Sequence, residues 1–249
     1  MITPTSVLAL RLAGPLQSWG ASSRFTRRTT ESAPTKSGVI GLLAAAAGIE
    51  RGDDARLAPL AALRFGVRID QPGTRVRDFQ TAHHSVTGKS MPLSERFYLA
   101  DAVFVAVVEG EHTLLAELYA ALRAPVYPPF LGRRSCPPSG PVELGLHERA
   151  RLEDVLLDVP WQASDWYRRR LLHQAPDKLT VLRERAVDER GATDALRDQP
   201  LSFAAAHRRH ALRTVVTTHV ALPPGPPDEW QGHHDPFEAL PGALEDESV

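Results

Sequence analysis

Apolar residues along the chain follow two different spacings, which predict both strands and helices. Residues 7–12 and 102–108 are short, almost continuous apolar runs, typical of buried strands, and residues 63–69 alternate apolar with basic positions. Residues 35–48 and 114–122 place apolar side chains three or four positions apart, as one face of a helix does. The first half of the chain therefore mixes helices and strands.

The order of these elements indicates a fold class. With a further strand at residues 75–79, the order is strand, helix, strand, strand, strand, helix, which suits the ferredoxin-like split βαβ plan once a hairpin is inserted. Helices then cover one sheet face, and the other is the face on which RRM-type domains bind single-stranded RNA. We therefore predict an α+β, ferredoxin-like core, with Arg64 and Arg68 on its open face.

A polar segment at residues 81–97 separates the predicted strands. It carries His83, His84, Lys89 and Arg96 and has no apolar face of its own. Such a projection is usually functional or mobile. We predict a long polar hairpin or loop here.

The rest of the chain is expected to complete the fold. Residues 152–157 suit a strand or a short helix, residues 165–170 a charged loop, and residues 178–185 and 212–220 two strands. The expected parts, in order, are a core at 1–150 with its polar projection at about 81–97, a smaller β-rich C-terminal region at 151–222, and an acidic disordered tail at 223–249.

The formal net charge of -1 conceals an asymmetry. Residues 1–222 hold 29 Lys and Arg against 23 Asp and Glu, a net charge of +6, whereas the tail holds seven acids and no base. A basic body suggests a polyanionic partner. Because only three of the basic residues are lysines, a compositional bias toward arginine is an equal alternative, although arginine is also the better phosphate ligand.

Four segments carry candidate nucleic-acid contacts. Residues 13–20 are rich in turn formers and contain Trp19, so a loop anchored by that ring is predicted. In the next segment, cations alternate with one ring, as Arg24, Phe25, Arg27 and Arg28. This pattern suits a nucleic-acid backbone and a stacked base, and equally a solvated loop held by Phe25.

The helix at residues 35–48 begins with Thr35 as a plausible N-cap, and Gly48 suits its C-terminal cap. Its free N–H groups, with Lys36 and Ser37, could hold a phosphate, although an ordinary capped core helix is the simpler interpretation. The fourth segment places Arg133 and Arg134 after a glycine, between prolines. It suits either a phosphate clamp or a structural loop.

Signatures of catalysis are absent from the sequence. It has no G-x-S-x-G, H-E-x-x-H, C-x-x-C or dinucleotide-binding motif, and no metal or cofactor site is predicted. His83 and His84 are the only appealing pair for acid–base cleavage of RNA. The lone Cys136 cannot form an internal disulfide, no membrane segment is evident, and a cytoplasmic location is the default.

Four motifs together resemble a known family. They are LAGPLQSWG at 12–20, PTKSGVIGLL at 34–43, RDFQT at 77–81 and FLGRRSCP at 130–137. The chain is similar, from about residue 7 to about residue 220, to type I-E members of the fifth family of CRISPR-associated (Cas) proteins. That resemblance implies a ferredoxin-like RAMP core with an inserted thumb hairpin at about 81–97. It also implies a subunit of Cascade, the guide-RNA surveillance complex of antiviral defence, that caps the 5′ handle of the CRISPR RNA (crRNA).

The resemblance also implies partners and site residues. The partners are the crRNA, the backbone subunit CasC and the large subunit CasA, with target DNA reached only through the complex. The predicted RNA-binding residues are Trp19, Arg24, Arg27, Lys36, Ser37, Lys89, Arg96, Arg133 and Arg134. Type I-E members are non-cleaving, whereas type I-C relatives are metal-independent endoribonucleases that process repeat RNA, and this remains the alternative.

One hypothesis concerns how these residues act together. Lys36, Arg133 and Arg134 are predicted to form one phosphate-holding surface. In the competing interpretation, the two arginines brace the fold by pairing with acids such as Asp78 or Asp101.

Overall fold

The structure is a computed structural model that describes residues 5–20, 27–171, 176–186 and 189–223. Of the predicted features, Arg24 and residues 224–249 of the tail lie outside the described residues, and only the backbone of Arg27 is described. Each feature below refers to these ranges.

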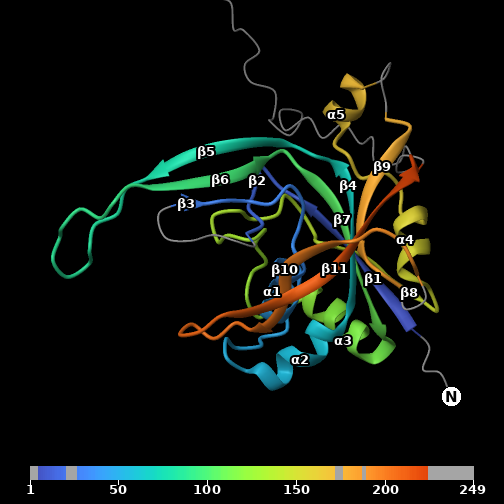
Figure 1. The fold of residues 1–249 in the computed structure, drawn as a ribbon, viewed down its shortest axis with the longest axis horizontal. Coiled ribbons are helices and arrows are strands. Elements are labelled where there is room, and N and C mark those ends of the chain that lie inside the picture. The colour runs from blue at the N-terminus through green and yellow to red at the C-terminus, as the bar shows by residue number, and fades with distance from the viewer. Residues whose placement is uncertain (1–4, 21–26, 172–175, 187–188, 224–249) are drawn as a thin grey trace, which may run out of the picture.

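A seven-stranded antiparallel sheet forms the body of the molecule (Figure 1). In spatial order its strands are β10 (Asp194–Ser202), β11 (Arg209–Ala221), β9 (Lys178–Glu184), β4 (Arg64–Gln71), β7 (Val103–Glu111), β1 (Thr5–Ala13) and β8 (Glu143–Glu148). The apolar run in β7 is buried from Val103 to Val108, as expected for a central strand. The C-terminal strands extend the same sheet through pairing of β9 with β4.

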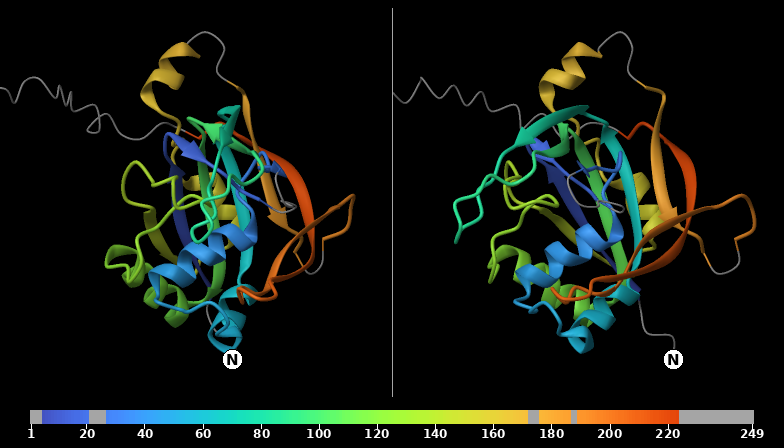
Figure 2. Two further views of the ribbon diagram at one scale, coloured as in Figure 1. Left: turned by 90° about the vertical axis from the view of Figure 1, so that its left-hand side faces the viewer. Right: turned by 60° about the vertical axis from the view of Figure 1, so that its left-hand side comes forward.

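Three helices are associated with one side of this sheet (Figure 2). They are α1 (Lys36–Ala46), α2 (Asp54–Ala62) and α3 (His112–Arg123). Leu8 and Leu10 of β1 and Phe104 of β7 join the apolar faces of the helices in the largest core cluster. The predicted caps of α1 are confirmed: the Thr35 hydroxyl accepts from the Gly38 N–H at 3.2 Å, and Gly48 has φ +65°.

The opposite face of the sheet is not open in its centre, contrary to expectation. The helix α4 (Leu152–Asp158) packs on Val7, Ala9, Val105 and Val107. These alternate along β1 and β7 with the residues that face α1 and α3, so both faces of the two strands are apolar. The sheet centre is therefore unavailable as an RNA platform.

The basic positions of β4 are used inside the protein. Arg68 is fully buried and forms a two-pronged ion pair with Asp70, at 2.7 and 2.9 Å. It also donates to the carbonyls of Leu156, Val159 and Pro160 at the end of α4. The predicted placement of Arg68 on an open surface is wrong, because its guanidinium binds the carbonyl groups that α4 leaves unpaired.

A long β-hairpin, which we call the arm, projects from the body (Figure 1). It consists of β5 (Thr74–Gln80) and β6 (Ser94–Ala100), paired along their full length, and the turn between them. The arm thus begins before and ends after the predicted residues 81–97. At the base of the arm β6 also pairs with β2 (Leu16–Gln17), and toward the turn it pairs with β3 (Arg27–Arg28).

The helix α5 (Asp165–Arg170) occupies the segment predicted as a charged loop. Asp165 lies at its N-terminal end and Arg168 to Arg170 in its last turn, which complements the helix dipole, and Asp165 pairs with Arg168. Residues 152–157 are helical as well. The longest described helix has 12 residues, and none has the length and hydropathy of a bilayer-spanning helix.

Replacing Arg68 tests the packing of α4. We expect Arg68→Met to lower the free energy of unfolding by about 3–5 kcal/mol, because Asp70 is left buried without its counter-charge. Urea unfolding of Arg68→Met measures this, with the exposed Arg77→Met as the control, which should stay within about 0.5 kcal/mol of the unchanged chain. Equal stability of the two variants would contradict the bracing role.

Candidate nucleic-acid interface

Loops that are distant in sequence meet at the base of the arm. The Ser18 N–H donates to the Leu131 carbonyl at 3.0 Å, and the Ser18 hydroxyl donates to the Phe97 carbonyl of β6 at 3.1 Å. Segments 12–20 and 130–137, both singled out in the sequence, therefore lie together beside β6. The interface is built from these loops and from the base of the arm.

A tight turn fixes the position of Arg133 and Arg134. Gly132 has φ +83°, and a Cβ there would overlap the Ser18 carbonyl oxygen, so only glycine fits. The Cys136 N–H donates to the Arg133 carbonyl at 2.9 Å. Burial raises the pKa of the Cys136 thiol, which keeps it protonated and structural.

Arg133 lies over an aromatic ring. Its guanidinium carbon lies 4.6 Å from the centre of the Tyr98 ring, and its Nη2 donates to the Arg28 carbonyl at 3.0 Å. Its Nη1 is buried and has no hydrogen-bond partner among the described residues. Neither Asp78 nor Asp101 contacts Arg133, so the bracing scheme proposed from the sequence is wrong for this residue.

Arg96 lies on the same face of the arm as the Tyr98 ring that Arg133 covers. Strand β3 pairs in parallel with β6 so that Arg28 faces Arg96, and side chains of paired residues share a face. Tyr98 follows Arg96 by two positions and so shares that face as well. The Arg96 Nε is also buried without a partner among the described residues. We call Arg28, Arg96, Arg133 and Arg134 the arm-base cluster.

The arm-base cluster holds four arginines, and the carboxylate of Asp78 shares a face of the arm with Arg96, its partner across the two strands. Arg28 and Arg134 are exposed, and no member forms an ion pair with a described carboxylate. Guanidinium groups held by a ring and a carbonyl, with spare N–H groups, are suited to bind phosphate oxygens. The cluster therefore has the chemistry of a nucleic-acid backbone site.

Trp19 is a core residue in this structure. Its side chain is fully buried, its indole N–H donates to the Gln17 amide oxygen at 3.0 Å, and its ring lies against Gly38 of α1. A Cβ at Gly38 would come within 2.8 Å of the ring, so the glycine allows this contact. An RNA base cannot reach the ring here, and the role of Trp19 is to support the loop that carries Ser18.

Lys36 is also buried, with 3% of its surface exposed. Its Nζ lies 2.9 Å from the Glu184 carboxylate, and its backbone N–H donates to Asp198 at 2.8 Å. Burial lowers the pKa of Lys36, and Glu184 opposes that shift. The predicted common surface of Lys36, Arg133 and Arg134 is therefore not formed, because a carboxylate already occupies the N-terminus of α1.

The remaining predicted residues lie apart from the arm-base cluster. Ser37 is half-buried, with its hydroxyl 3.4 Å from that of Thr35. Lys89 is exposed in the turn of the arm, beyond the bridge between His83 and Ser90. Sequence reasoning missed Tyr98, although its spacing of two from Arg96 in a predicted polar hairpin was a usable signal.

The two adjacent histidines shape the turn of the arm. The His83 Nδ1 lies 3.2 Å from the Gly88 carbonyl, and the His84 Nδ1 accepts from the N–H groups of Val86 and Thr87 at 3.4 and 3.3 Å. No described carboxylate orients either ring. Among the described residues, no three His, Cys, Asp or Glu side chains are placed to hold a metal ion.

Lys36 can be assigned by a stability measurement. We expect Lys36→Met to lower the free energy of unfolding by at least about 1.5 kcal/mol, because Glu184 loses a buried, charged hydrogen bond. Urea unfolding measures the change, and the neighbouring Ser37→Ala, at a half-buried hydroxyl, serves as the control. A variant with unchanged stability and weakened RNA binding would instead place Lys36 on the RNA surface.

Comparison with known proteins shows the family of the chain. A family model described as CRISPR-associated protein (Cas_Cas5) matches residues 7–216. The Cascade subunit CasD of Escherichia coli (strain K12) is 36% identical over 180 residues, which span 65% of this chain and 80% of that protein. The matched segment includes all members of the arm-base cluster.

Two solved structures are similar over most of the chain. One, a crystal structure of a Cas protein, is 38% identical with a TM-score of 0.68, and the match covers 89% of this chain and all of that one. The other, from a CRISPR RNA-guided surveillance complex, is 31% identical with a TM-score of 0.66 and covers 90% and 96%. The chain therefore belongs to the Cas5 family of CRISPR-associated proteins.

Proposed function

We propose that the chain is a non-catalytic guide-RNA-binding subunit of a type I-E Cascade complex and that it caps the 5′ handle of the crRNA. Support comes from the relative named as a Cascade subunit and from the similar chain in an RNA-guided surveillance complex. The proposed partners are the crRNA, CasC and CasA, with target DNA reached only through the complex. The proposed location is the cytoplasm.

The strand order supports a ferredoxin-like core in this proposal. Strands β8, β1, β7 and β4 are neighbours in that order, all antiparallel, and α1 and α3 connect β1 to β4 and β7 to β8. This order is the one expected of the split βαβ arrangement, with the arm inserted between β4 and β7. We propose that the arm is the thumb of a RAMP protein.

A single observation supports the arm-base cluster as the handle site. The Arg96 Nε and the Arg133 Nη1 are buried, on one face of the arm, without a partner among the described residues. A buried donor left unpaired costs free energy, so such groups are normally matched by a ligand or by water. Two phosphate oxygens of a single strand would satisfy them, with Arg28 and Arg134 at the edge.

The other predicted residues take different parts in the proposal. Arg24 and Arg27 adjoin Arg28 in sequence and would continue the phosphate path. Lys89 would contact RNA or a neighbouring subunit from the turn of the arm. Trp19, Lys36 and Ser37 would act indirectly, by holding the loop and the helix that support the cluster.

Processing of repeat RNA is the alternative function. Cleavage without a metal requires a base and an acid oriented around the scissile phosphate. His83 and His84, the pair singled out for that role, use their Nδ1 atoms within the turn of the arm and are exposed. Their surroundings favour a structural role, which is why we propose binding without cleavage.

The salt dependence of RNA binding tests the cluster. Each lost phosphate contact should lower the slope of log affinity against log salt by about 0.7, so Arg134→Ala should lose about 0.7 and Arg133→Ala with Arg134→Ala about 1.4. Fluorescence anisotropy with a single-stranded handle RNA measures the slopes. Melting temperature should hardly change for the exposed Arg134.

The exposed Arg151, beside α4, provides a matched control. Arg151→Ala removes the same charge from the body and should leave the slope unchanged. Equal slopes for Arg151→Ala and Arg134→Ala would show that binding reflects net charge alone and would remove the cluster from the proposal.

The proposed absence of cleavage has its own test. Changing His83 and His84 together to Ala should leave the 5′ ends of the guide RNA bound in cells unaltered, because neither ring is set for proton transfer. Sequencing those ends decides the matter. Ends that shift or disappear in the double variant would favour the endoribonuclease.

A further inference from the structure

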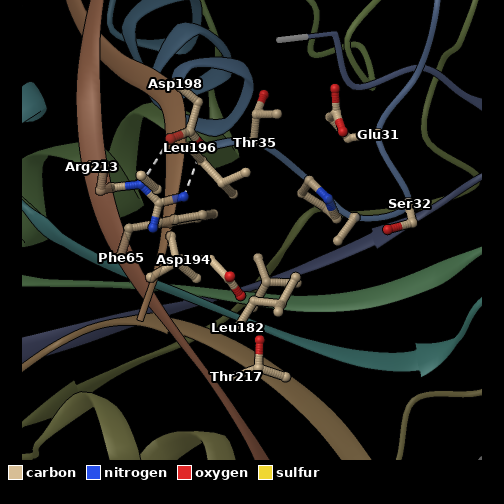
Figure 3. A pocket seen from close by; sticks show the side chains of 15 residues that line it. Glu31, Ser32, Thr35, Phe65, Leu182, Asp194, Leu196, Asp198, Arg213 and Thr217 are labelled. Carbon is tan, nitrogen blue, oxygen red and sulfur yellow. Dashed lines mark hydrogen bonds and ion pairs between the residues drawn. The ribbon is translucent and has the colours of Figure 1, made fainter. Parts of the chain in front are cut away.

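A cavity of about 380 Å³ lies between the start of α1 and the C-terminal strands (Figure 3). Its walls are largely apolar, and polar groups reach it at a few points. The lining residues used below are Glu31, Phe65, Asp194, Ala195, Asp198 and Arg213. No residue predicted to bind RNA lines it.

Arg213 lines this cavity and has one unpaired donor. The residue is only 8% exposed, and its Nε and Nη2 bind Asp198 at 2.9 and 2.7 Å. Its Nη1 is buried and has no partner among the described residues. Figure 3 shows the two bonded nitrogens facing Asp198 and the third on the far side of the guanidinium. Burying such a donor is costly unless a ligand or water accepts from it.

Two acceptors lie elsewhere around the same cavity. Asp194 is exposed, Glu31 is partly buried, and neither carboxylate forms a hydrogen bond or ion pair with a described side chain. Glu31 lies on the opposite side of the cavity from Arg213 (Figure 3). The cavity therefore combines a donor, acceptors and apolar walls.

This combination excludes some ligands and favours others. A phosphate is disfavoured because Glu31, Asp194 and Asp198 all repel it. A nucleobase is neutral, has apolar faces for the walls and carries donors and acceptors on its edges. Guanine fits best, since it accepts at O6 and N7, the atoms that arginine contacts, and donates from N1 and N2.

We propose that this cavity binds one guanine base, splayed out of an RNA strand whose phosphates lie on the arm-base cluster. The inference rests on the proposed function for its ligand. A short path joins the two sites: residues 28–35 begin in the cluster and end in the cavity wall, and Arg75 fixes the path by donating to the Thr30 carbonyl at 2.9 Å. A partner peptide has no comparable link to the cavity.

Single-base substitutions in a probe RNA test the proposal. The probe is an eight-nucleotide oligouridine in which each position in turn carries guanosine, adenosine, cytidine or inosine, with binding measured by anisotropy. At one position guanosine should bind about tenfold more tightly than uridine, as expected for one well-placed base. Inosine, which lacks the N2 amine, should retain only part of that gain.

A rim substitution locates the effect. Ala195 is exposed at the cavity, so Ala195→Trp should fill it without disturbing the core and should abolish the guanosine preference while oligouridine still binds. Ala192→Trp, three residues away and outside the lining, is the matched control and should keep the preference. A preference that survives Ala195→Trp, or no preference, would overturn the proposal.

Two further outcomes separate guanine binding in the cavity from the handle binding on which it rests. If oligouridine does not bind at all, handle binding fails, and free guanosine then tests the cavity by saturation-transfer NMR, with cytidine as the comparison. Signal from guanosine that Ala195→Trp removes would uphold the cavity, and no such signal would overturn it. If Ala195→Trp blocks only assembly with other Cascade subunits, the cavity is a protein contact and the proposal is wrong.

Discussion

The Asp198 carboxylate is the group on which the arrangement of this protein depends. It accepts from the backbone N–H of Lys36, where α1 begins, and from two nitrogens of Arg213 on β11. Asp198 itself belongs to β10 at the edge of the sheet and is fully buried. One carboxylate therefore ties the central helix to strands that lie more than 150 residues later, and the dipole of α1 stabilises its charge.

The position of α1 decides where the basic loop lies. Gly38 lets α1 approach Trp19, and the Trp19 loop carries Ser18, which holds Leu131 and leaves room only for glycine at position 132. Arg133 follows directly. The arm-base cluster is thus placed by a series of close contacts that begins at the start of α1, so buried residues that touch no RNA still determine its geometry.

The sequence predicted where the helices and strands lie better than it predicted which partners the charged residues bind. Apolar spacing located β1, α1, β7 and α3, because each buries one or two faces. Apolar spacing missed β10, because this strand has polar positions and Pro200. Both suit a strand at the edge of a sheet, which is paired on one side only. Sequence reasoning assigned Lys36 to phosphate because a helix start attracts anions, and nothing local reveals that the anion is Asp198.

Local sequence also does not reveal which arginines are paired with acids inside the fold and which are not. Arg68 and Arg213 form ion pairs with buried carboxylates, whereas Arg96 and Arg133 form none with a described carboxylate. Composition cannot separate these two groups, because the difference lies in which acid the fold brings to each arginine. If the arginines at the arm bind the phosphates of an RNA strand, the cavity at the start of α1 does not compete for those phosphates, because carboxylates line it. Its carboxylates would repel the backbone and accept hydrogen bonds from a base, so affinity and base selectivity would come from different, oppositely charged surfaces.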